Sequence, residues 1–65
     1  CKETDFLFGE FAKSEILKLS DDELLVYQDL INEYDGAIYY WILRRSESDD
    51  KYRVLVDKIR VFHKI

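Results

Sequence analysis

The chain has 65 residues, of which 48% are hydrophobic and 37% charged, and its formal net charge is −4. This length supports one domain, residues 1–65, and a small core leaves little room for the roughly 300–1,000 Å³ that small-molecule sites enclose. The acidic balance argues against a general nucleic-acid binder, which needs a basic surface. The chain holds one cysteine, Cys1, so no internal disulfide can form. The longest apolar run, residues 37–43, is too short to span a bilayer.

The first predicted helix covers residues 3–19. Its apolar side chains recur at spacings of three and four, which is typical of one helix face, and they are Phe8, Phe11, Ala12, Ile16 and Leu19. Gly9 lies within this segment, where glycine costs about 1 kcal/mol relative to alanine. We therefore expect the helix to bend or begin at Gly9, or another helix to pack closely against it.

The second predicted helix runs to about Glu33 and opens with a strong start signal. Ser20 followed by Glu23 is a capping box, in which each residue satisfies a backbone N–H of the other. The inner face is predicted to carry Leu24, Tyr27 and Ile31. The acids of the first turn favour the positive end of the helix dipole.

The third predicted helix covers residues 37–45. Gly36 is expected to end the preceding helix in a left-handed conformation, and Asp35 is expected to cap this one. Its predicted inner face holds Ile38, Trp41 and Ile42. Two neighbouring tyrosines, 39 and 40, cannot both face inward beside these residues, so at least one should be exposed.

The last predicted helix follows a polar loop, residues 46–50, and runs to about His63. It carries the clearest amphipathic stripe of the chain, formed by Tyr52, Leu55, Val56, Ile59 and Phe62. Four helices joined by short turns predict an all-α fold, a small compact helical bundle in which sequential neighbours pack roughly antiparallel.

Groups that carry chemistry are scarce. Two separated glycines make no phosphate-binding loop, and one histidine with one terminal cysteine cannot complete a metal site. His63 is expected to be solvated or to lie beside a helix end, and Cys1 is expected to have no role. The sequence therefore predicts no catalytic, cofactor-binding or metal-binding residue, and a protein that is not an enzyme.

Four residues are candidates for contact with a partner protein. Glu3 and Asp5 precede the first apolar stripe, and either a dipole role or a contact role would explain them. Phe6 lies off the stripe and Tyr39 competes with Tyr40 for the interior. Each aromatic could pack at the edge of the core or anchor a partner.

Three segments, in this order and spacing, resemble one family: residues 2–12, residues 19–24, and Asp35 with residues 38–42. They are similar to the FAD assembly factors of succinate dehydrogenase, found in bacteria and mitochondria. The resemblance covers nearly the whole chain. The family signature is an Arg-Gly pair, two variable residues and a glutamate. Glu3 matches the glutamate, and the pair would lie just before Cys1.

The resemblance implies a five-helix bundle of which this chain holds four helices, the first being absent. It implies binding to the flavoprotein subunit of succinate dehydrogenase, or of fumarate reductase, and promotion of covalent FAD attachment to a client histidine. FAD would be handled on the client and not bound tightly by the helper. On this basis we expect Glu3, then Asp5, then Phe6 and Tyr39 to bind the partner.

We also expect a monomer when free, located in the bacterial cytoplasm because no transit segment is visible, with the mitochondrial matrix as the alternative. Two other functions stay open. One is an FAD-binding carrier module, against which the missing phosphate loop argues. The other is a helical nucleic-acid-binding domain, supported only by the basic residues of the last helix: Lys51, Arg53, Lys58, Arg60 and Lys64.

Overall fold

The computed structural model describes residues 2–65, which form four α-helices and two short 3-10 helices and contain no strand. The α-helices are α1 (Lys2–Glu15), α2 (Asp21–Leu30), α3 (Asp35–Ile42) and α4 (Arg53–His63). The 3-10 helices are η1 (Ile16–Lys18) and η2 (Asp50–Tyr52). The predicted all-α helical bundle is confirmed.

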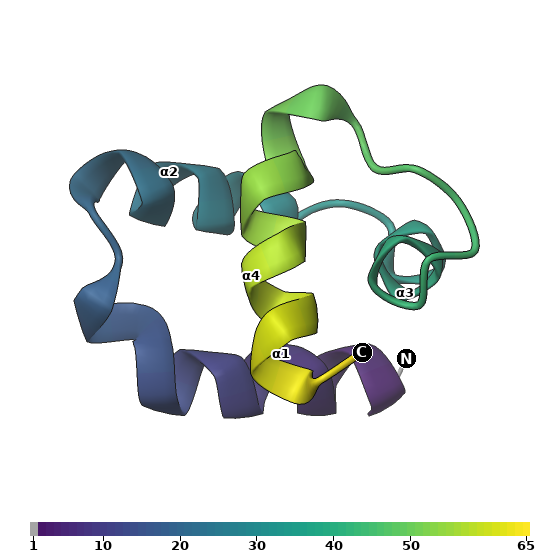
Figure 1. Ribbon diagram of the computed structural model, residues 1–65. Coiled ribbons are helices and arrows are strands. Elements are labelled where there is room, and N and C mark those ends of the chain that lie inside the picture. The colour runs from purple at the N-terminus through teal and green to yellow at the C-terminus, as the bar shows by residue number, and fades with distance from the viewer. Residues whose placement is uncertain (1) are drawn as a thin grey trace.

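The helices do not all pack as antiparallel neighbours. Figure 1 shows α1 and α2 running in opposite directions, as expected, whereas α4 crosses both of them steeply and α3 is seen end-on. α4 packs against each of the other three helices. Its amphipathic stripe is therefore the centre of the core.

One hydrophobic core holds the helices together, and its buried members come from every element except η1. They are Phe8, Phe11, Leu30, Ile38, Trp41, Ile42, Tyr52, Leu55, Val56 and Ile59. The predicted inner faces of the third and fourth helices are thus confirmed, with Phe62 packed at the edge. The prediction for Ile31 is wrong. α2 ends at the fully buried Leu30, and Ile31 as its C-terminal cap is 45% exposed.

The first helix starts before Gly9 and passes through it. No atom other than its own backbone and chain neighbours lies within 4 Å of where a Cβ would stand at Gly9, so the expected close packing of another helix is wrong. The residue is exposed on α1. The predicted helical segment 3–19 holds as α-helix to Glu15, after which η1 tightens the chain into the turn.

The predicted capping box at the start of α2 is confirmed. The Glu23 N–H donates to Ser20 Oγ over 3.1 Å, and the Ser20 N–H donates to Glu23 Oε1 over 2.9 Å. Lys58 of α4 binds the other carboxylate oxygen of Glu23. Hydrogen bonds from Lys58 and then from the Ser20 backbone lower the pKa of Glu23 below its usual 4.5. The hydrogen bonds to the ionised Glu23 carboxylate therefore stabilise the folded protein at neutral pH. Their contribution is lost as the pH falls through the lowered pKa of Glu23.

Gly36 has a different role from the predicted one. No glycine in residues 2–65 has a positive φ, and Gly36 is the second residue of α3. A Cβ at Gly36 would stand 2.6 Å from Cε2 of Tyr34, so a larger residue there would require the exposed Tyr34 ring to move aside. Asp35 is the first residue of α3 and Tyr34 is its N-cap, without a side-chain cap. The predicted capping role of Asp35 is therefore wrong.

The end of α3 uses the left-handed conformation that was expected at Gly36. Arg44 has a φ of 63°, its N–H donates to the Trp41 carbonyl, and the Arg45 N–H donates to the Tyr40 carbonyl over 2.8 Å. This pair of bonds is a Schellman motif. It ends the helix at Ile42, three residues before the predicted end. The Arg60 guanidinium also donates to the Trp41 carbonyl, from Nε over 3.1 Å, at the negative end of the α3 dipole.

A buried phenol joins η2 to α2. Tyr52 is fully buried, and its hydroxyl lies 2.8 Å from Glu33 Oε2 and 3.0 Å from Asp29 Oδ2. One hydroxyl has one proton, so it donates to one carboxylate at a time. Burial, followed by the two carboxylates, raises the pKa of Tyr52 far above its usual value. Lys51 lies 3.5 Å from Asp29 Oδ2 and completes the cluster.

Candidate docking site between α1 and α3

The first two turns of α1 and the second half of α3 border an open pocket of about 420 Å³. Its lining is mainly apolar, with one basic and one acidic side chain, and consists of Lys2, Glu3, Phe6, Leu7, Tyr39 and Leu43. An open pocket of this composition can receive an apolar side chain of another protein. A charged group of that protein can then meet the carboxylate or the ammonium group at the rim.

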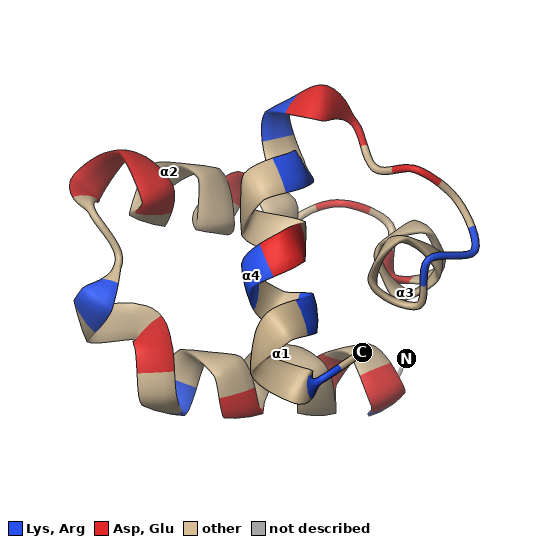
Figure 2. Cartoon of the chain, viewed as in Figure 1, with Lys and Arg blue, Asp and Glu red and all other residues tan. Residues whose placement is uncertain are grey.

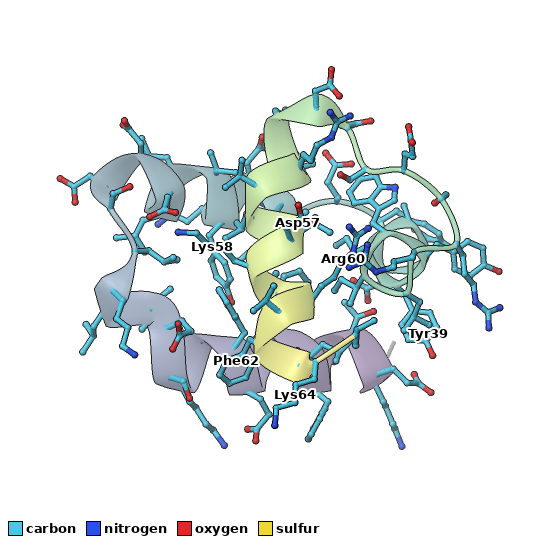
Figure 3. The ribbon with its side chains drawn as sticks, in the orientation of Figure 1. Tyr39, Asp57, Lys58, Arg60, Phe62 and Lys64 are labelled. Carbon is cyan, nitrogen blue, oxygen red and sulfur yellow. The ribbon has the colours of Figure 1, made fainter. Side chains whose placement is uncertain are left out.

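Helix periodicity brings these side chains together. Glu3, Phe6 and Leu7 stand three and four residues apart on α1 and so share one face. Tyr39 and Leu43 are related in the same way across the end of α3. Figure 3 shows Tyr39 pointing from α3 toward the beginning of α1.

Two contacts hold α1 in place behind the pocket. Thr4 is 1% exposed, and its hydroxyl donates to the Asp35 carbonyl at the start of α3 over 3.4 Å. His63, at the end of α4, lies with Nε2 2.8 Å from the Leu7 carbonyl. A carbonyl only accepts, so Nε2 carries the proton. The pocket wall is therefore fixed from two other helices.

His63 has more contacts than the sequence indicated. Its ring is half-buried and makes an edge-to-face contact with Phe62 at 4.9 Å, and it lies 6.4 Å from the Phe6 ring. The expected solvated role is wrong, although the residue does lie in the last turn of its helix. The imidazole supports the pocket wall from behind and does not line the pocket.

The structure brings together three of the four predicted contact residues. Glu3, Phe6 and Tyr39 line the same pocket, and Phe6 is 62% exposed. Asp5 is exposed but is not among the lining residues. It stands two residues from Glu3, which places it on another side of the helix. The expectation that one of the two neighbouring tyrosines is exposed is confirmed, since Tyr40 is 51% exposed.

Two apolar lining residues were not among the predicted contact residues. Leu7 and Leu43 each lie four residues after a predicted residue, Glu3 and Tyr39 respectively, so helical spacing alone could have added them. The contact of His63 with Leu7 joins residues 56 positions apart. No local sequence pattern carries that information.

Charged residues surround the first turn of α1, at the edge of the pocket. Figure 2 shows acidic residues at the beginning of α1, and within residues 2–65 Glu3 has no ion-pair partner.

Within residues 2–65, no three His, Cys, Asp or Glu residues are placed to hold a metal ion. No helix of that range is long and apolar enough to cross a membrane. Cys1 lies outside the described residues.

A family described as "Flavinator of succinate dehydrogenase" matches residues 1–63 of the chain. The chain belongs to this family. The resemblance predicted from its sequence segments is therefore confirmed.

Curated relatives share the name succinate dehydrogenase assembly factor 2, mitochondrial. The chain is 44% identical to the protein of Komagataella phaffii over 45 residues, 69% of this chain and 24% of the relative. It is 46% identical to that of Saccharomyces cerevisiae over 46 residues, 71% of this chain and 28% of the relative. With the protein of Dictyostelium discoideum it is 34% identical over 61 residues, 94% of this chain and 43% of the relative.

The chain thus spans from a quarter to less than half of the length of these relatives. Their names place them in mitochondria, which agrees with the alternative location considered above and gives no support to a bacterial cytoplasm. No solved structure matches the chain.

Proposed function

We propose that this protein is a non-catalytic assembly factor that binds the flavoprotein subunit of succinate dehydrogenase, or of fumarate reductase, and promotes covalent attachment of FAD to it. The observation that supports this function best is the pocket between α1 and α3. The pocket joins an exposed ring, Phe6, to a half-buried one, Tyr39, and aromatic residues are enriched at protein docking surfaces. The Glu3 carboxylate beside them can meet a basic group of the client.

The proposed mechanism needs no reacting group on this chain. The flavin and the client histidine supply the chemistry, and the helper favours the client conformation in which they react. A helper can shift that conformational equilibrium only by its difference in affinity for the two states. A pocket wall fixed by Thr4 and His63 suits this task, because a preorganised surface loses little entropy on binding.

We further propose that FAD stays on the client and is not bound tightly by this chain. Phosphate groups favour helix N-termini, yet three helices here carry acids in their first turn, such as Glu3 in α1, Asp22 in α2 and Asp35 in α3. The box of Ser20 and Glu23 also occupies backbone N–H groups at the start of α2. These carboxylates would repel a pyrophosphate.

We also propose that the protein does not bind nucleic acid. The basic residues in and before α4 are largely neutralised by ion pairs within the chain. Lys51 pairs with Asp29, Arg53 with Asp50, Lys58 with Glu23, and Arg60 with Asp57. Cations held in this way are poorly placed to replace the counterions of a phosphate backbone.

The relatives named mitochondrial lead us to propose a mitochondrial location for this protein as well. The client flavoprotein would meet it there. Fractionation of the source cells would place it with mitochondrial marker proteins, and recovery with cytosolic markers would contradict the proposal.

The function is tested by covalent flavin on the client. We expect client flavoprotein produced with this protein to retain flavin fluorescence after denaturation, and client produced alone to retain several-fold less. Titration of the isolated protein with free FAD should show no saturable binding at micromolar concentrations. Equal flavin retention with and without the protein would contradict the assembly role, and tight FAD binding would favour the carrier module instead.

A further inference from the structure

Within residues 2–65, two residues other than glycine have a left-handed backbone conformation. They are Arg44 and Lys64, with φ values of 63° and 60°. A side chain with a Cβ is strained in this conformation, so glycine is the usual residue there. Both residues are basic, and each stands at the C-terminal end of a helix, α3 for Arg44 and α4 for Lys64. Strain of this kind often persists where the side chain has a function.

The two helix ends meet at the edge of the α1–α3 pocket, and Figure 2 shows basic residues at both ends. Nη2 of Arg44, which directly follows a lining residue of the pocket, lies 3.5 Å from the Ile65 carbonyl oxygen. On the other side of Lys64, Nε2 of His63 lies 2.8 Å from the carbonyl oxygen of Leu7, which lines the pocket. The end of α4 and the residues after it therefore extend from the α1 side of the pocket to the α3 side. Arg44 and Lys64 together form a basic rim beside the pocket.

The two cations of the basic rim have no acidic partner in the part of the chain that the structure describes. Both residues are exposed, and neither forms an ion pair within residues 2–65. Six of the other eight lysines and arginines do pair with a carboxylate: Lys13, Lys18, Lys51, Arg53, Lys58 and Arg60. Arg44 uses only one of its five N–H groups toward Ile65. The basic rim can therefore bind an external anion.

The helix dipole alone does not explain the basic rim. Cations near a helix C-terminus are stabilised by the dipole, but each helix end has another cation that supplies this effect without backbone strain. Arg45 follows α3 directly after Arg44, and Arg60 stands in the last turn of α4. Neither Arg45 nor Arg60 has a positive φ. The charges at the two strained positions therefore need a further reason.

We propose that the basic rim binds a carboxylate of the client flavoprotein, next to the apolar side chain that enters the α1–α3 pocket. This inference rests on the proposed function, because it concerns the same docking site. Glu3 stands one helical turn from Leu7 and forms no ion pair with either cation of the rim. The pocket is thus bordered by an acid and by a basic rim at separate places. A client surface with the complementary order of charges can dock in one orientation only.

The first experiment measures client affinity by calorimetry and thermal stability by circular dichroism on the same variants of the whole chain. Arg44→Gly combined with Lys64→Gly relieves the backbone strain, so the melting temperature should equal or exceed that of the wild type. The same double variant should bind the client flavoprotein roughly tenfold more weakly. A residue that serves only the fold would not separate stability from affinity in this way.

Lys13→Gln combined with Lys18→Gln is the matched control. It changes the net charge by the same amount, at exposed lysines outside the pocket lining. We expect it to change client affinity less than about twofold, since only long-range steering is altered. Restoring the charges with Arg44→Lys and Lys64→Arg should restore most of the affinity that the double glycine variant loses.

The outcomes separate this inference from the proposed function. If the wild type binds the client and the double glycine variant binds equally well, the basic rim is overturned and the proposed function stands. If the wild type does not bind the client at all, the proposed function fails and the rim fails with it. An equal loss of affinity in the charge-preserving variant would also overturn the rim, because the effect would not follow charge.

The second experiment locates the anion on the client. A carbodiimide activates a carboxylate, which then forms an amide bond with an amine that touches it. In the complex we expect such a bond between Lys64 Nζ and an aspartate or glutamate of the client, identified by mass spectrometry of proteolytic fragments. Lys64→Arg keeps the charge but cannot form this amide, so the cross-linked fragment should disappear. Cross-links from Lys13 or Lys18 without one from Lys64 would overturn the proposed contact.

Discussion

Glu3→Lys should weaken binding of the client flavoprotein about 30-fold or more and reduce covalent flavin attachment in parallel. The carboxylate lies at the rim of the α1–α3 pocket beside the exposed ring of Phe6, where the surface is most suited to contact. The charge reversal removes the carboxylate and sets an ammonium group against the basic group of the client that the carboxylate would meet, and like charges in contact cost several kcal/mol. A loss of about 2 kcal/mol corresponds to roughly 30-fold in affinity. Isothermal titration calorimetry of client with wild-type and variant protein would measure the change.

Asp5→Lys is the matched control for that variant. It makes the same change of charge two residues away, on the same helix, but outside the pocket lining. The overall charge of both variants is equal, so any difference between them reflects position and not long-range attraction. We expect Asp5→Lys to lower affinity only a few-fold, through weaker electrostatic steering.

The aromatic side of the pocket allows a second matched pair. Tyr39 lines the α1–α3 pocket, whereas its neighbour Tyr40 lines a separate hollow with Tyr34 and Ala37. Tyr39→Ala should therefore reduce client affinity about tenfold more than Tyr40→Ala. Equal effects of Glu3→Lys and Asp5→Lys, together with equal effects of the two tyrosine variants, would place the docking surface elsewhere.

The sequence predicted a structural feature correctly where residues close together in the chain determine that feature. The Ser20–Glu23 capping box depends on residues three apart, and the α4 stripe depends only on spacing, and both are found as predicted. The wrong expectation at Gly36 has a physical reason. A glycine can serve a left-handed turn or simply be part of a helix, and only the backbone conformation of the folded chain, in which Gly36 has no positive φ, distinguishes the two.

The candidate site was predictable in part for the same reason. Residue type and helical phase singled out Glu3 and Phe6, whereas Tyr39 was chosen on the family resemblance, because its place at the pocket depends on how α3 is rotated. That rotation is set by Trp41 and Ile38, which are buried against other helices. The bond from His63 to Leu7 depends on the crossing of α4 over α1, which no local pattern specifies.

Alkaline pH is expected to unfold the protein through Tyr52. In the folded protein, burial and the carboxylates of Glu33 and Asp29 raise the pKa of this phenol far above its usual value of about 10. In the unfolded chain the phenol loses its proton near pH 10. Its contribution to stability is thus complete below pH 10 and is lost progressively above it. Each further pH unit multiplies the ratio of unfolded to folded protein by about ten.

Tyr52→Phe separates this effect from other alkaline titrations. The variant loses the hydroxyl bonds that join η2 to α2, so its melting temperature at neutral pH should fall by roughly 5–10 °C. Its stability should nevertheless depend less steeply on pH above 10, because the linked proton is gone. Tyr40→Phe, at an exposed tyrosine, is the matched control and should keep the wild-type slope.

The deciding measurement follows tyrosinate absorbance and helical circular dichroism together as the pH rises. We expect the last of the five tyrosines to ionise only as the helical signal disappears, because the Tyr52 proton can leave only when the core opens. Ionisation of all five near pH 10 with the helices intact would show that the phenol titrates in the folded state. In that case the Tyr52 cluster would not be the site that links proton release to unfolding.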